Sequence, residues 1–298
     1  MILLAGGTGT LGRVLAGSLR EAGLPFRILT RDSGRAAELR DAGMEAAVGD
    51  AEDLTDAVRA ANGCATVVSA ISGFGPESGS TPEAVDRDGN INLIRAAEAA
   101  GAHRFVLFSM RGASSSHPLE LARMKYAAEK RLLAGALEWT ILRPTTILET
   151  YAGLMGDSLR KSGVAAVFGR GDNPVNFVSA RDLAEAAVFA VKGGLKDQAV
   201  DVGGPDNLTL NSLAALLIEL NGDGRTVHVP LPLLRAAASG ARLVSPRWGR
   251  VLGGAIHLAV ADMSFDARPD RARLPGVPYT SARSALAMRG PAAAAPEA

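Results

Sequence analysis

The sequence predicts an α/β fold built on a doubly wound parallel sheet and followed by a smaller lobe. Two observations lead to this prediction. Short apolar runs alternate with amphipathic helical patterns through the first half of the chain, as parallel strands joined by helical crossovers do. Some of these runs, such as Phe105-Val106-Leu107-Phe108, show no polar alternation, which is typical of strands covered by helices on both faces.

Each strand is expected where an apolar run ends at a turn signal, and each helix where an amphipathic pattern follows. The expected strands are residues 2–5, 26–30, 45–48, 66–70, 105–109 and 139–142. The expected helices between them are residues 11–22, 34–41, 53–60, 83–100 and 119–135. A glycine near each helix end favours a left-handed C-terminal cap. These glycines are Gly23, Gly43, Gly63, Gly101 and Gly135.

The regular alternation loosens after Pro144. Glycine-rich loops are expected near residues 153–174, a strand near 199–202, and helices near 209–220 and 231–243. We therefore expect a cofactor-binding core at 1–145, then a mixed region at 146–290 that adds the last core elements and a small substrate-binding lobe. A disordered tail is expected at 291–298, which contains only Ala, Pro and one Glu.

Composition excludes several classes of protein. The 298 residues are 47% hydrophobic and 4% aromatic, which supplies an aliphatic core and excludes disorder as the main state. Lys and Arg number 32 against 31 acidic residues, so no overall field attracts nucleic acid or an anionic membrane. The single cysteine, Cys64, forms no internal disulfide and is expected to be a small buried hydrophobe. Without a signal-peptide pattern or a membrane span, a cytoplasmic protein is expected, with no nucleic acid and no membrane as partner.

A glycine-rich turn joins the first strand to the first helix. The segment Gly6-Gly7-Thr8-Gly9-Thr10-Leu11-Gly12 places glycines at spacings of three. The first permits a tight turn, the second lets the backbone approach a pyrophosphate, and the third lets the helix pack closely on the sheet. A glycine-rich turn without a ligand is the alternative. The position in the first strand-helix unit favours a dinucleotide-binding Rossmann core. Its expected contacts are Gly6, Thr8, Gly9, Thr10, Leu11 and Gly12.

The tip of the second strand indicates which dinucleotide binds. It reads Ile28-Leu29-Thr30-Arg31-Asp32, with an arginine directly after the strand and no acidic residue at its tip. A guanidinium suits a 2′-phosphate, whereas an acidic residue would bind a free 2′-hydroxyl. NADP is therefore expected, with NAD possible and Arg35 as a second contact. Two alternatives stay open: Arg31 and Arg35 are solvated loop charges, or Asp32 reaches the ribose of NAD.

Further cofactor contacts are expected at the ends of the third and fourth strands. Asp50 follows the third strand, where such folds carry an acid that contacts the adenine, although it could equally cap the helix at 53–60. Ser69, Ala70 and Ile71 end the fourth strand and would line the cofactor.

With these features the chain resembles an atypical short-chain dehydrogenase/reductase, and within that superfamily it is similar to the NmrA-like group. The resemblance covers about residues 1–220. The motifs that carry it are the glycine spacing, Thr30-Arg31, Gly49-Asp50, the strand ending at Ser109, Leu142-Arg143-Pro144, the segment 176–182 and Val202-Gly203-Gly204-Pro205. It implies a cofactor contact at Pro144, a lysine at Lys125 that bonds the nicotinamide ribose, and a serine at Ser109 that orients the substrate carbonyl.

The tyrosine of the larger superfamily is missing. There it lies four residues before the lysine and exchanges a proton with the substrate, but Leu121 stands at that position here. Tyr126 adjoins Lys125, about 100° of helical rotation away, and does not replace it. The ordinary Tyr-Lys mechanism is therefore not expected. The alternative for Lys125 is a surface lysine in a charged helix.

The resemblance implies an NADP(H)-dependent oxidoreductase that reduces a small quinone- or enone-like molecule, with Lys125 as a possible proton donor. A non-catalytic NAD(P) sensor with a protein partner is the second hypothesis, and a nucleotide-sugar epimerase or dehydratase the third. No metal site is expected, because His103 and His117 lack partners at ligand spacing. The pattern specifies no oligomeric state. A set of apolar residues fits either a cleft wall or ordinary lobe core: Ile147, Leu148, Tyr151, Leu154 and Met155.

Overall fold

The computed structural model describes residues 1–74 and 79–289, without the side chains of residues 242, 243 and 289. These residues form two compact units. The first comprises Met1–Pro144, Ala180–Val202 and Ala272–Pro278, and the second comprises Thr145–Ser179, Gly203–Arg271 and the described residues from Tyr279. Segments 180–202 and 272–278 belong to the first unit although they follow residue 145 in the chain. The first unit is therefore not one continuous stretch of sequence. The tail expected at 291–298 lies outside the described residues.

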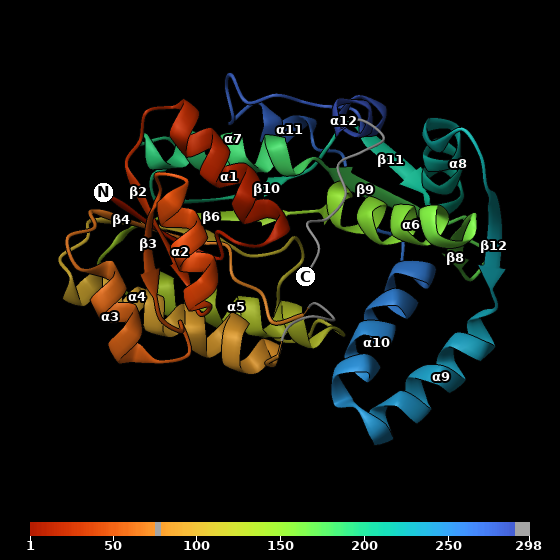
Figure 1. Ribbon diagram of the computed structural model, residues 1–298, viewed down its shortest axis with the longest axis horizontal. Helices are drawn as coiled ribbons and strands as arrows, with labels where there is room; N and C mark the ends of the chain where they lie inside the picture. The colour runs from red at the N-terminus through yellow and green to blue at the C-terminus, as the bar shows by residue number, and fades with distance from the viewer. Residues whose placement is uncertain (75–78, 290–298) are drawn as a thin grey trace. The chain divides into compact units, whose positions relative to one another are not determined.

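A seven-stranded sheet forms the centre of the first unit (Figure 1). In spatial order its strands are β10 (Gln198–Val202), β6 (Glu138–Pro144), β5 (Arg104–Phe108), β4 (Thr66–Ser69), β1 (Ile2–Ala5), β2 (Phe26–Thr30) and β3 (Glu45–Val48). Neighbouring strands all pair in parallel, with Ala5 of β1 opposite Leu29 of β2 and Ser69 of β4. The predicted doubly wound parallel sheet is confirmed. The strand order reverses between β1 and β4, which is where sheets of this kind bind ligands.

Helices cover both faces of this sheet (Figure 1). One face carries α1 (Thr10–Glu21) and α7 (Ala180–Val191), and the other carries α3 (Leu54–Ala61), α4 (Asn90–Ala99) and α5 (Glu120–Leu133). A further helix, α2 (Ser33–Asp41), connects β2 to β3. The uninterrupted apolar runs of the strands supply the core, where Phe105, Leu107 and Ile141 are fully buried against Leu93 and Leu132 of the helices.

The predicted helix ends are mostly confirmed. Gly23, Gly43, Gly63 and Gly101 all have positive φ after their helices. Gly135 is different, because α5 ends at Leu133 and its cap, Ala134, is right-handed. A Cβ on Gly135 would lie 2.8 Å from the Glu98 carboxylate, which is the movable end of a flexible side chain, so neither a left-handed turn nor a fixed contact requires this glycine. The helix predicted at 83–100 begins as a π-helix, η1 (Glu83–Gly89), and continues as α4.

The second unit combines two small sheets with helices. One sheet has the order β11 (Asp206–Thr209), β9 (Pro174–Val178) and β7 (Thr146–Ile147); the other pairs β12 (Arg225–Val229) with β8 (Val164–Phe168). Its helices are α6 (Leu148–Ser162), α8 (Leu210–Asn221), α9 (Leu231–Val244), α10 (Pro246–Val260), α11 (Arg268–Arg271) and α12 (Ala282–Arg289). Among the described residues, no helix has both the length and the apolar character to cross a bilayer.

Of the glycine-rich loops expected near residues 153–174, only residues 169–173 form a loop, because α6, β8 and the start of β9 occupy the rest of this stretch. Helix α6 passes through Gly153 and Gly156, although each glycine disfavours a helix by about 1 kcal/mol. Leu148, Ala152 and Leu159 repeat at helical spacing and are buried in the core of this unit, and that packing outweighs the glycines. The strand expected near 199–202 and the helices expected near 209–220 and 231–243 are confirmed as β10, α8 and α9.

Candidate active site

The carboxyl edge of the large sheet gathers most of the residues that the sequence singles out. Parallel strands in register end at the same edge, so residues that follow them in the chain come together there. Each strand contributes in this way: Gly6 follows β1, Arg31 follows β2, Asp50 follows β3, Ser69, Ala70 and Ile71 close β4, Ser109 follows β5, and Pro144 ends β6.

The turn from β1 to α1 is held together by contacts that leave no room for side chains at Gly6 and Gly12. Gly6 has a φ of +86°, and a Cβ there would lie 2.6 Å from the backbone carbonyl of Ala70. A Cβ on Gly12 would overlap the carbonyl oxygen of Gly6 and lie 2.7 Å from the Cα of Gly7. The Gly9 N–H donates to the Gly6 carbonyl at 3.1 Å. These two glycines are therefore required by the fold of the turn itself.

Gly9 is different, because the protein around it does not require a glycine. Its φ is −76°, and a Cβ at this position would have the Gly6 oxygen as its nearest neighbour, at an ordinary 3.5 Å. Gly9 is exposed and occupies the N-cap position of α1, where it supplies no side-chain acceptor. The missing side chain leaves space for a group that approaches the turn from outside.

The turns from β2 to α2 and from β3 to α3 are closed by carboxylates. Asp32 caps α2 by accepting from the Gly34 and Arg35 amides, and Asp53 caps α3 by accepting from the amides of Thr55 and Asp56. These backbone hydrogen bonds lower the pKa of Asp53. Of the three turns, only the one at α1 leaves its first amides open to an external anion. The glycine-rich turn is therefore a suitable cradle for a diphosphate.

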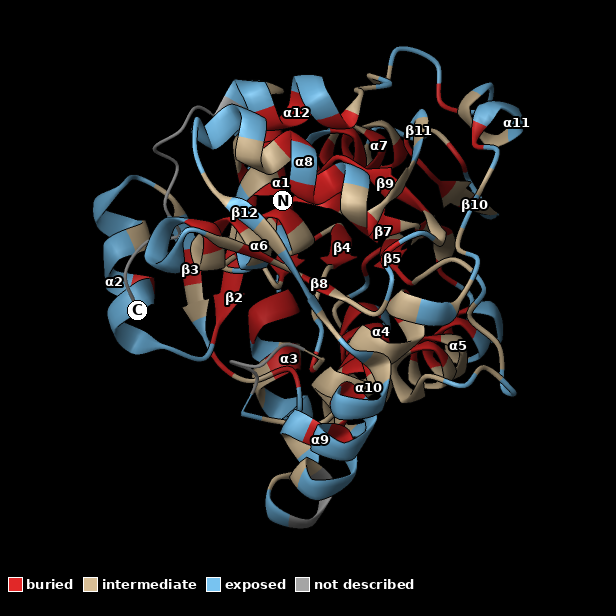
Figure 2. Cartoon of the chain, turned by 90° about the vertical axis from the view of Figure 1, so that its right-hand side faces the viewer, coloured by how far each residue is buried: buried red, intermediate tan, exposed pale blue. Residues whose placement is uncertain are grey.

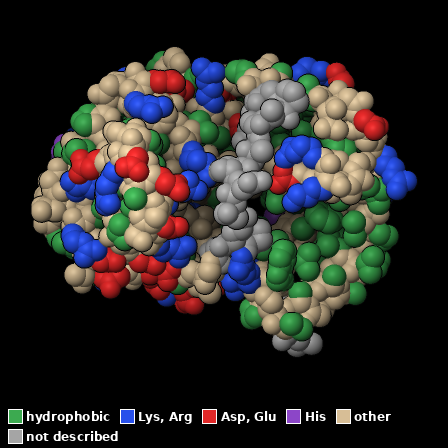
Figure 3. Space-filling model, viewed as in Figure 1, with side chains coloured by type: hydrophobic (Ala, Val, Ile, Leu, Met, Phe, Trp, Pro, Cys, Tyr) green, Lys and Arg blue, Asp and Glu red, His purple; other side chains and the backbone are tan. Residues whose placement is uncertain are grey.

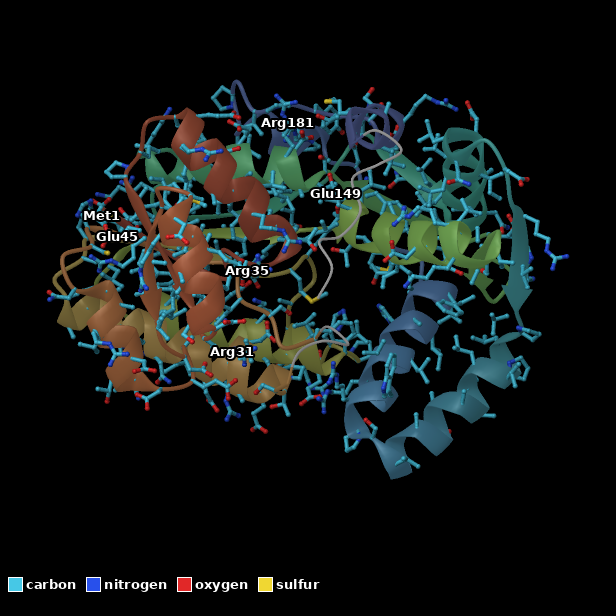
Figure 4. All side chains as sticks on the ribbon, in the orientation of Figure 1. Met1, Arg31, Arg35, Glu45, Glu149 and Arg181 are labelled. Atoms are coloured by element: carbon cyan, nitrogen blue, oxygen red, sulfur yellow. The ribbon has the colours of Figure 1, made fainter. Side chains whose placement is uncertain are left out.

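Two arginines follow β2, Arg31 directly after the strand and Arg35 in α2, and their surroundings differ (Figure 4). The Arg35 guanidinium pairs with Glu38 on its own helix at 2.7 Å. The Arg31 side chain is 55% exposed, and its Nη1 lies 3.9 Å from Asp50 Oδ2. Asp50 accepts from the Glu52 amide at 3.0 Å, whereas Asp53 is the residue that caps α3, so the expectation that Asp50 might cap this helix is wrong.

Lys125 of α5 is a buried cation rather than a surface lysine. Only 4% of the residue is exposed, which contradicts the surface alternative. Its Nζ lies 3.0 Å from Asp86 Oδ1 and donates to the Ile71 carbonyl, just after β4, at 2.8 Å. An ammonium carries three donors, so these two contacts leave one for another group at this edge.

Ser109 presents a buried hydroxyl at the end of β5. The residue is 5% exposed, and its N–H donates to the Leu142 carbonyl of β6 at 2.8 Å. Its Oγ has no hydrogen-bond partner among the residues that the structure describes. A buried polar group left without a partner is unfavourable by about 1–3 kcal/mol, so it marks a place where a ligand would satisfy it.

The family described as NAD(P)H-binding matches residues 6–192, a range that contains the glycine-rich turn, Arg31, Ser109 and Lys125. The chain belongs to this NAD(P)H-binding family. The expectation of an NAD(P) cofactor is thereby confirmed.

Individual relatives agree with this assignment. An NAD(P)H azoreductase of Xenophilus azovorans is 31% identical over 243 residues, covering 80% of this chain and 81% of the relative. The photosystem II assembly factor Ycf39 of a Synechocystis strain is 29% identical over 248 residues, covering 81% and 74%. An NADPH-dependent quinone oxidoreductase of Escherichia coli, solved with NADPH, has the same fold, with a TM-score of 0.76, 24% identity and coverage of 97% and 99%. The resemblance to NmrA-like atypical short-chain dehydrogenases/reductases is confirmed, and the chain is an NAD(P)H-dependent oxidoreductase of this type.

The ion pair at Lys125 includes a residue that the sequence did not single out. Asp86 lies in η1 and is fully buried, and its Oδ2 accepts from the Gly73 amide at 2.8 Å. Burial raises the pKa of Asp86, and the Lys125 ammonium and the Gly73 amide oppose that rise. The available signal was its spacing, because Asp86 shares one helical face with Leu93 and Ala97, which are buried apolar residues.

Two other side chains at this edge face the protein interior. The Ser69 hydroxyl is fully buried and donates to Asn90 Oδ1 at 2.6 Å, so only its backbone remains to line the cofactor. Glu129, one turn after Lys125, is 1% exposed and accepts two hydrogen bonds from Arg143, at 2.9 and 2.6 Å. This bond to Glu129 raises the pKa of Arg143 and ties α5 to β6.

The remaining predicted residues have plain structural positions. Leu121 and Tyr126, which precede and follow Lys125 in the sequence of α5, are both half-buried. The His117 ring accepts from the Leu119 amide at 3.1 Å, at the start of α5. Cys64 is buried, and burial raises the pKa of its thiol. Among the described residues, no cluster of three or more His, Cys, Asp or Glu could hold a metal ion.

The apolar set at the start of α6 is mainly core of the second unit. Leu148 is 1% exposed, and Tyr151 and Met155 pack against the same cluster. Leu154 is 58% exposed and does not belong to that cluster. For Leu148, Tyr151 and Met155 the structure thus supports the ordinary lobe core among the two alternatives.

Proposed function

We propose that this oxidoreductase binds NADPH and reduces a small quinone- or enone-like molecule without a catalytic tyrosine. One observation carries the proposal: the open N-terminus of α1 at Gly9 and the buried Lys125 ammonium lie at the same sheet edge, while Leu121 occupies the tyrosine position. Relatives named as an azoreductase and a quinone oxidoreductase support a reductive reaction.

The residues at this edge fit the parts of a dinucleotide. The first amides of α1 would bind the pyrophosphate, and the third Lys125 donor would bind a hydroxyl of the nicotinamide ribose. The Ser109 hydroxyl would donate to the oxygen of the substrate. Bound NADPH would supply a hydride, which carries both electrons of the reduction.

Without the tyrosine, the site favours acceptors whose reduction leaves a weakly basic anion. Hydride addition to a simple ketone produces an alkoxide, whose conjugate acid is about as weak an acid as water. Hydride addition to a quinone produces a phenolate-like anion, whose conjugate acid has a pKa of about 10. The second anion needs only a hydrogen bond from Ser109 and one proton from the Lys125 ammonium or from water. An acceptor of the quinone or enone type therefore suits a site that lacks a positioned phenol.

The direct test is turnover. Purified protein with NADPH is assayed against quinones, enones, azo dyes and simple ketones, with NADPH oxidation followed optically. We expect oxidation with the conjugated acceptors and little with the ketones. Tight NADPH binding without oxidation by any acceptor would contradict the proposal.

That contrary outcome would support a second candidate, a non-catalytic NAD(P)-binding protein that acts on a protein partner. Two observations favour it: a relative is named as an assembly factor, and Leu121 stands where the superfamily has its proton-transferring residue.

Arg31→Ala is expected to weaken NADPH binding roughly 10-fold while leaving NADH binding unchanged, because a charge-assisted contact to the 2′-phosphate is worth about 1.5–3 kcal/mol. Calorimetric titration with both nucleotides measures this. Arg35→Ala is the matched control, since the Arg35 guanidinium is already paired with Glu38 and a smaller effect is expected. Equal losses for NADPH and NADH would show that Arg31 does not read the phosphate.

Ser109→Ala is expected to raise the unfolding temperature slightly, because it removes an unsatisfied buried hydroxyl, and to lower kcat/KM roughly 10-fold. The hydroxyl has no protein partner among the described residues, so its removal breaks no hydrogen bond in the free protein. Steady-state kinetics and a thermal melt measure the two effects. Unaltered kinetics would remove Ser109 from the reaction.

A further inference from the structure

The α9–α10 hairpin of the second unit, residues 231–260, leaves much of its apolar surface uncovered. Four of its large apolar residues are at least half exposed: Leu233 at 62%, Val244 at 88%, Trp248 at 51% and Val260 at 50%. Of the 15 residues of α10, those that are buried are Gly249, Gly254 and Leu258. Figure 2 shows both helices mostly in the colours of intermediate and exposed residues, and Figure 3 shows hydrophobic side chains gathered over them. Contiguous exposed apolar surface of this kind marks an interaction site.

The charge of this hairpin differs from that of the whole chain. Residues 224–261 contain five arginines and no Asp or Glu, although the chain as a whole carries a formal +1. Four of these arginines lie in the hairpin itself: Arg235, Arg242, Arg247 and Arg250. Whole-chain charge therefore hides a segment with a strongly positive local field.

The sequence of α10 separates these two characters onto opposite faces. Trp248 and Leu252 share one side at a spacing of four residues, while Arg247 and Arg250, both half-buried, share another with the buried Leu258. Trp248 also lies in the first turn of α10, next to Arg247 in the chain. Apolar residues with an interfacial tryptophan on one side and arginines on the other are typical of helices that lie in a bilayer surface.

We propose that the α9–α10 hairpin is a peripheral membrane-binding element that places its apolar side in the surface of a bilayer containing anionic phospholipids. Such a surface offers phosphates to the arginines and an apolar boundary to Leu233 and Trp248, so it complements both features at once. The helices have 14 and 15 residues, which is shorter than the roughly 20 that a span requires, so the hairpin lies on the bilayer.

A second copy of the chain fits this surface less well. A two-fold symmetric contact brings the same patch of both subunits together, and here it would place two arginine-bearing, acid-free segments against each other. The inference goes beyond the proposed reaction and does not depend on it. The expected absence of a membrane partner rested on the lack of a membrane span and on the net charge of the whole chain. This segment is too short to span a bilayer but departs from that average charge.

The test is flotation of the full chain with phosphatidylcholine vesicles, with and without about 30% phosphatidylglycerol. We expect binding to the anionic vesicles, loss of that binding at about 0.5 M salt, and little binding to the neutral vesicles. The chain has two tryptophans, so Trp139→Phe leaves Trp248 as the single reporter, whose emission should shift to the blue when anionic vesicles are added.

Variants locate the binding surface. Trp248→Ala should weaken vesicle binding roughly 10-fold, and Arg235→Ala, which removes an exposed arginine, roughly 5-fold, which corresponds to about 1 kcal/mol per arginine near the surface. Arg170→Ala and Leu154→Ala remove an exposed arginine and an exposed leucine of the second unit outside the hairpin, and they should have no effect. Circular dichroism and thermal melts confirm that each variant is folded.

Three results would overturn the proposal. They are equal binding to neutral and anionic vesicles, no binding to either, and anionic binding that Trp248→Ala leaves unchanged. Sedimentation velocity without lipid tests the alternative occupant, a second copy of the chain. A dimer that Trp248→Ala dissociates, together with no vesicle binding, would assign this surface to that second copy.

Discussion

Gly12→Ala is expected to abolish measurable NADPH binding and to lower the free energy of unfolding. An added Cβ would overlap the Gly6 carbonyl oxygen and press on the Gly7 Cα, and both are backbone atoms that no rotamer change can move. Helix α1 would have to shift away from the turn, which carries its first amides out of reach of the pyrophosphate. Overpacking of this kind lowers stability by about 1–3 kcal/mol. Calorimetric titration and chemical denaturation measure the two effects.

Two glycines of the same helix and turn are the controls. Gly17 also lies in α1, but no described atom is within 4 Å of its Cβ position, so Gly17→Ala should retain binding and raise stability by roughly 0.5–1 kcal/mol. Gly9→Ala should fold normally, since its Cβ has ordinary space, yet lose most of its NADPH affinity. Normal binding by Gly9→Ala would show that the nucleotide does not approach this turn.

This contrast between glycines also shows what the sequence can and cannot predict. The turn was predictable because its chemistry is local: glycine spacing, a preceding strand and a following helix all stand within twelve residues. The sheet was predictable for the same reason, because each strand is a separate apolar run. Local patterns led us to expect that the region after residue 145 adds core elements, but the full extent of the returning segments, 180–202 and 272–278, depends on contacts with distant residues.

Asp86 illustrates the same limit within the site. Its partner, Lys125, is 39 positions away in the chain, and although the spacing of Asp86 with Leu93 and Ala97 indicates a buried position, it does not indicate the partner. Only the fold brings the carboxylate beneath the ammonium. Similarly, the glycines of α6 predict loops until the buried face of Leu148, Ala152 and Leu159 is matched to a core. Pairings made by tertiary structure leave little trace in one sequence.

Lys125→Met is expected to lower both the stability and the catalytic efficiency of the protein. The substitution removes one partner of a buried ion pair and leaves the Asp86 carboxylate without its cation, which typically lowers stability by about 3–5 kcal/mol. It also removes the donor proposed for the nicotinamide ribose, so kcat/KM should fall roughly 100-fold. Chemical denaturation and steady-state kinetics measure these two losses separately.

The loss of stability should depend on pH. Burial raises the pKa of Asp86, and without Lys125 the main opposing charge is gone. A carboxyl with a higher pKa in the folded state binds more protons there than in the unfolded chain, so stability falls as the pH rises from the unfolded value through the folded one. Relative to the parent protein, Lys125→Met should therefore be less destabilised at about pH 5 than at about pH 8. A difference that is constant with pH would show that Asp86 does not titrate in this range.

The double variant Lys125→Met/Asp86→Asn separates the structural role of the lysine from its chemical one. Asparagine removes the buried negative charge and keeps an oxygen for the Gly73 amide, so most of the lost stability should return. The ammonium is still absent, so kcat/KM should stay low and NADPH binding should stay weak. If activity returned together with stability, the role of Lys125 would be structural only, and the proposed contact to the ribose would be wrong. If stability returned without activity, the ammonium itself would be part of the site.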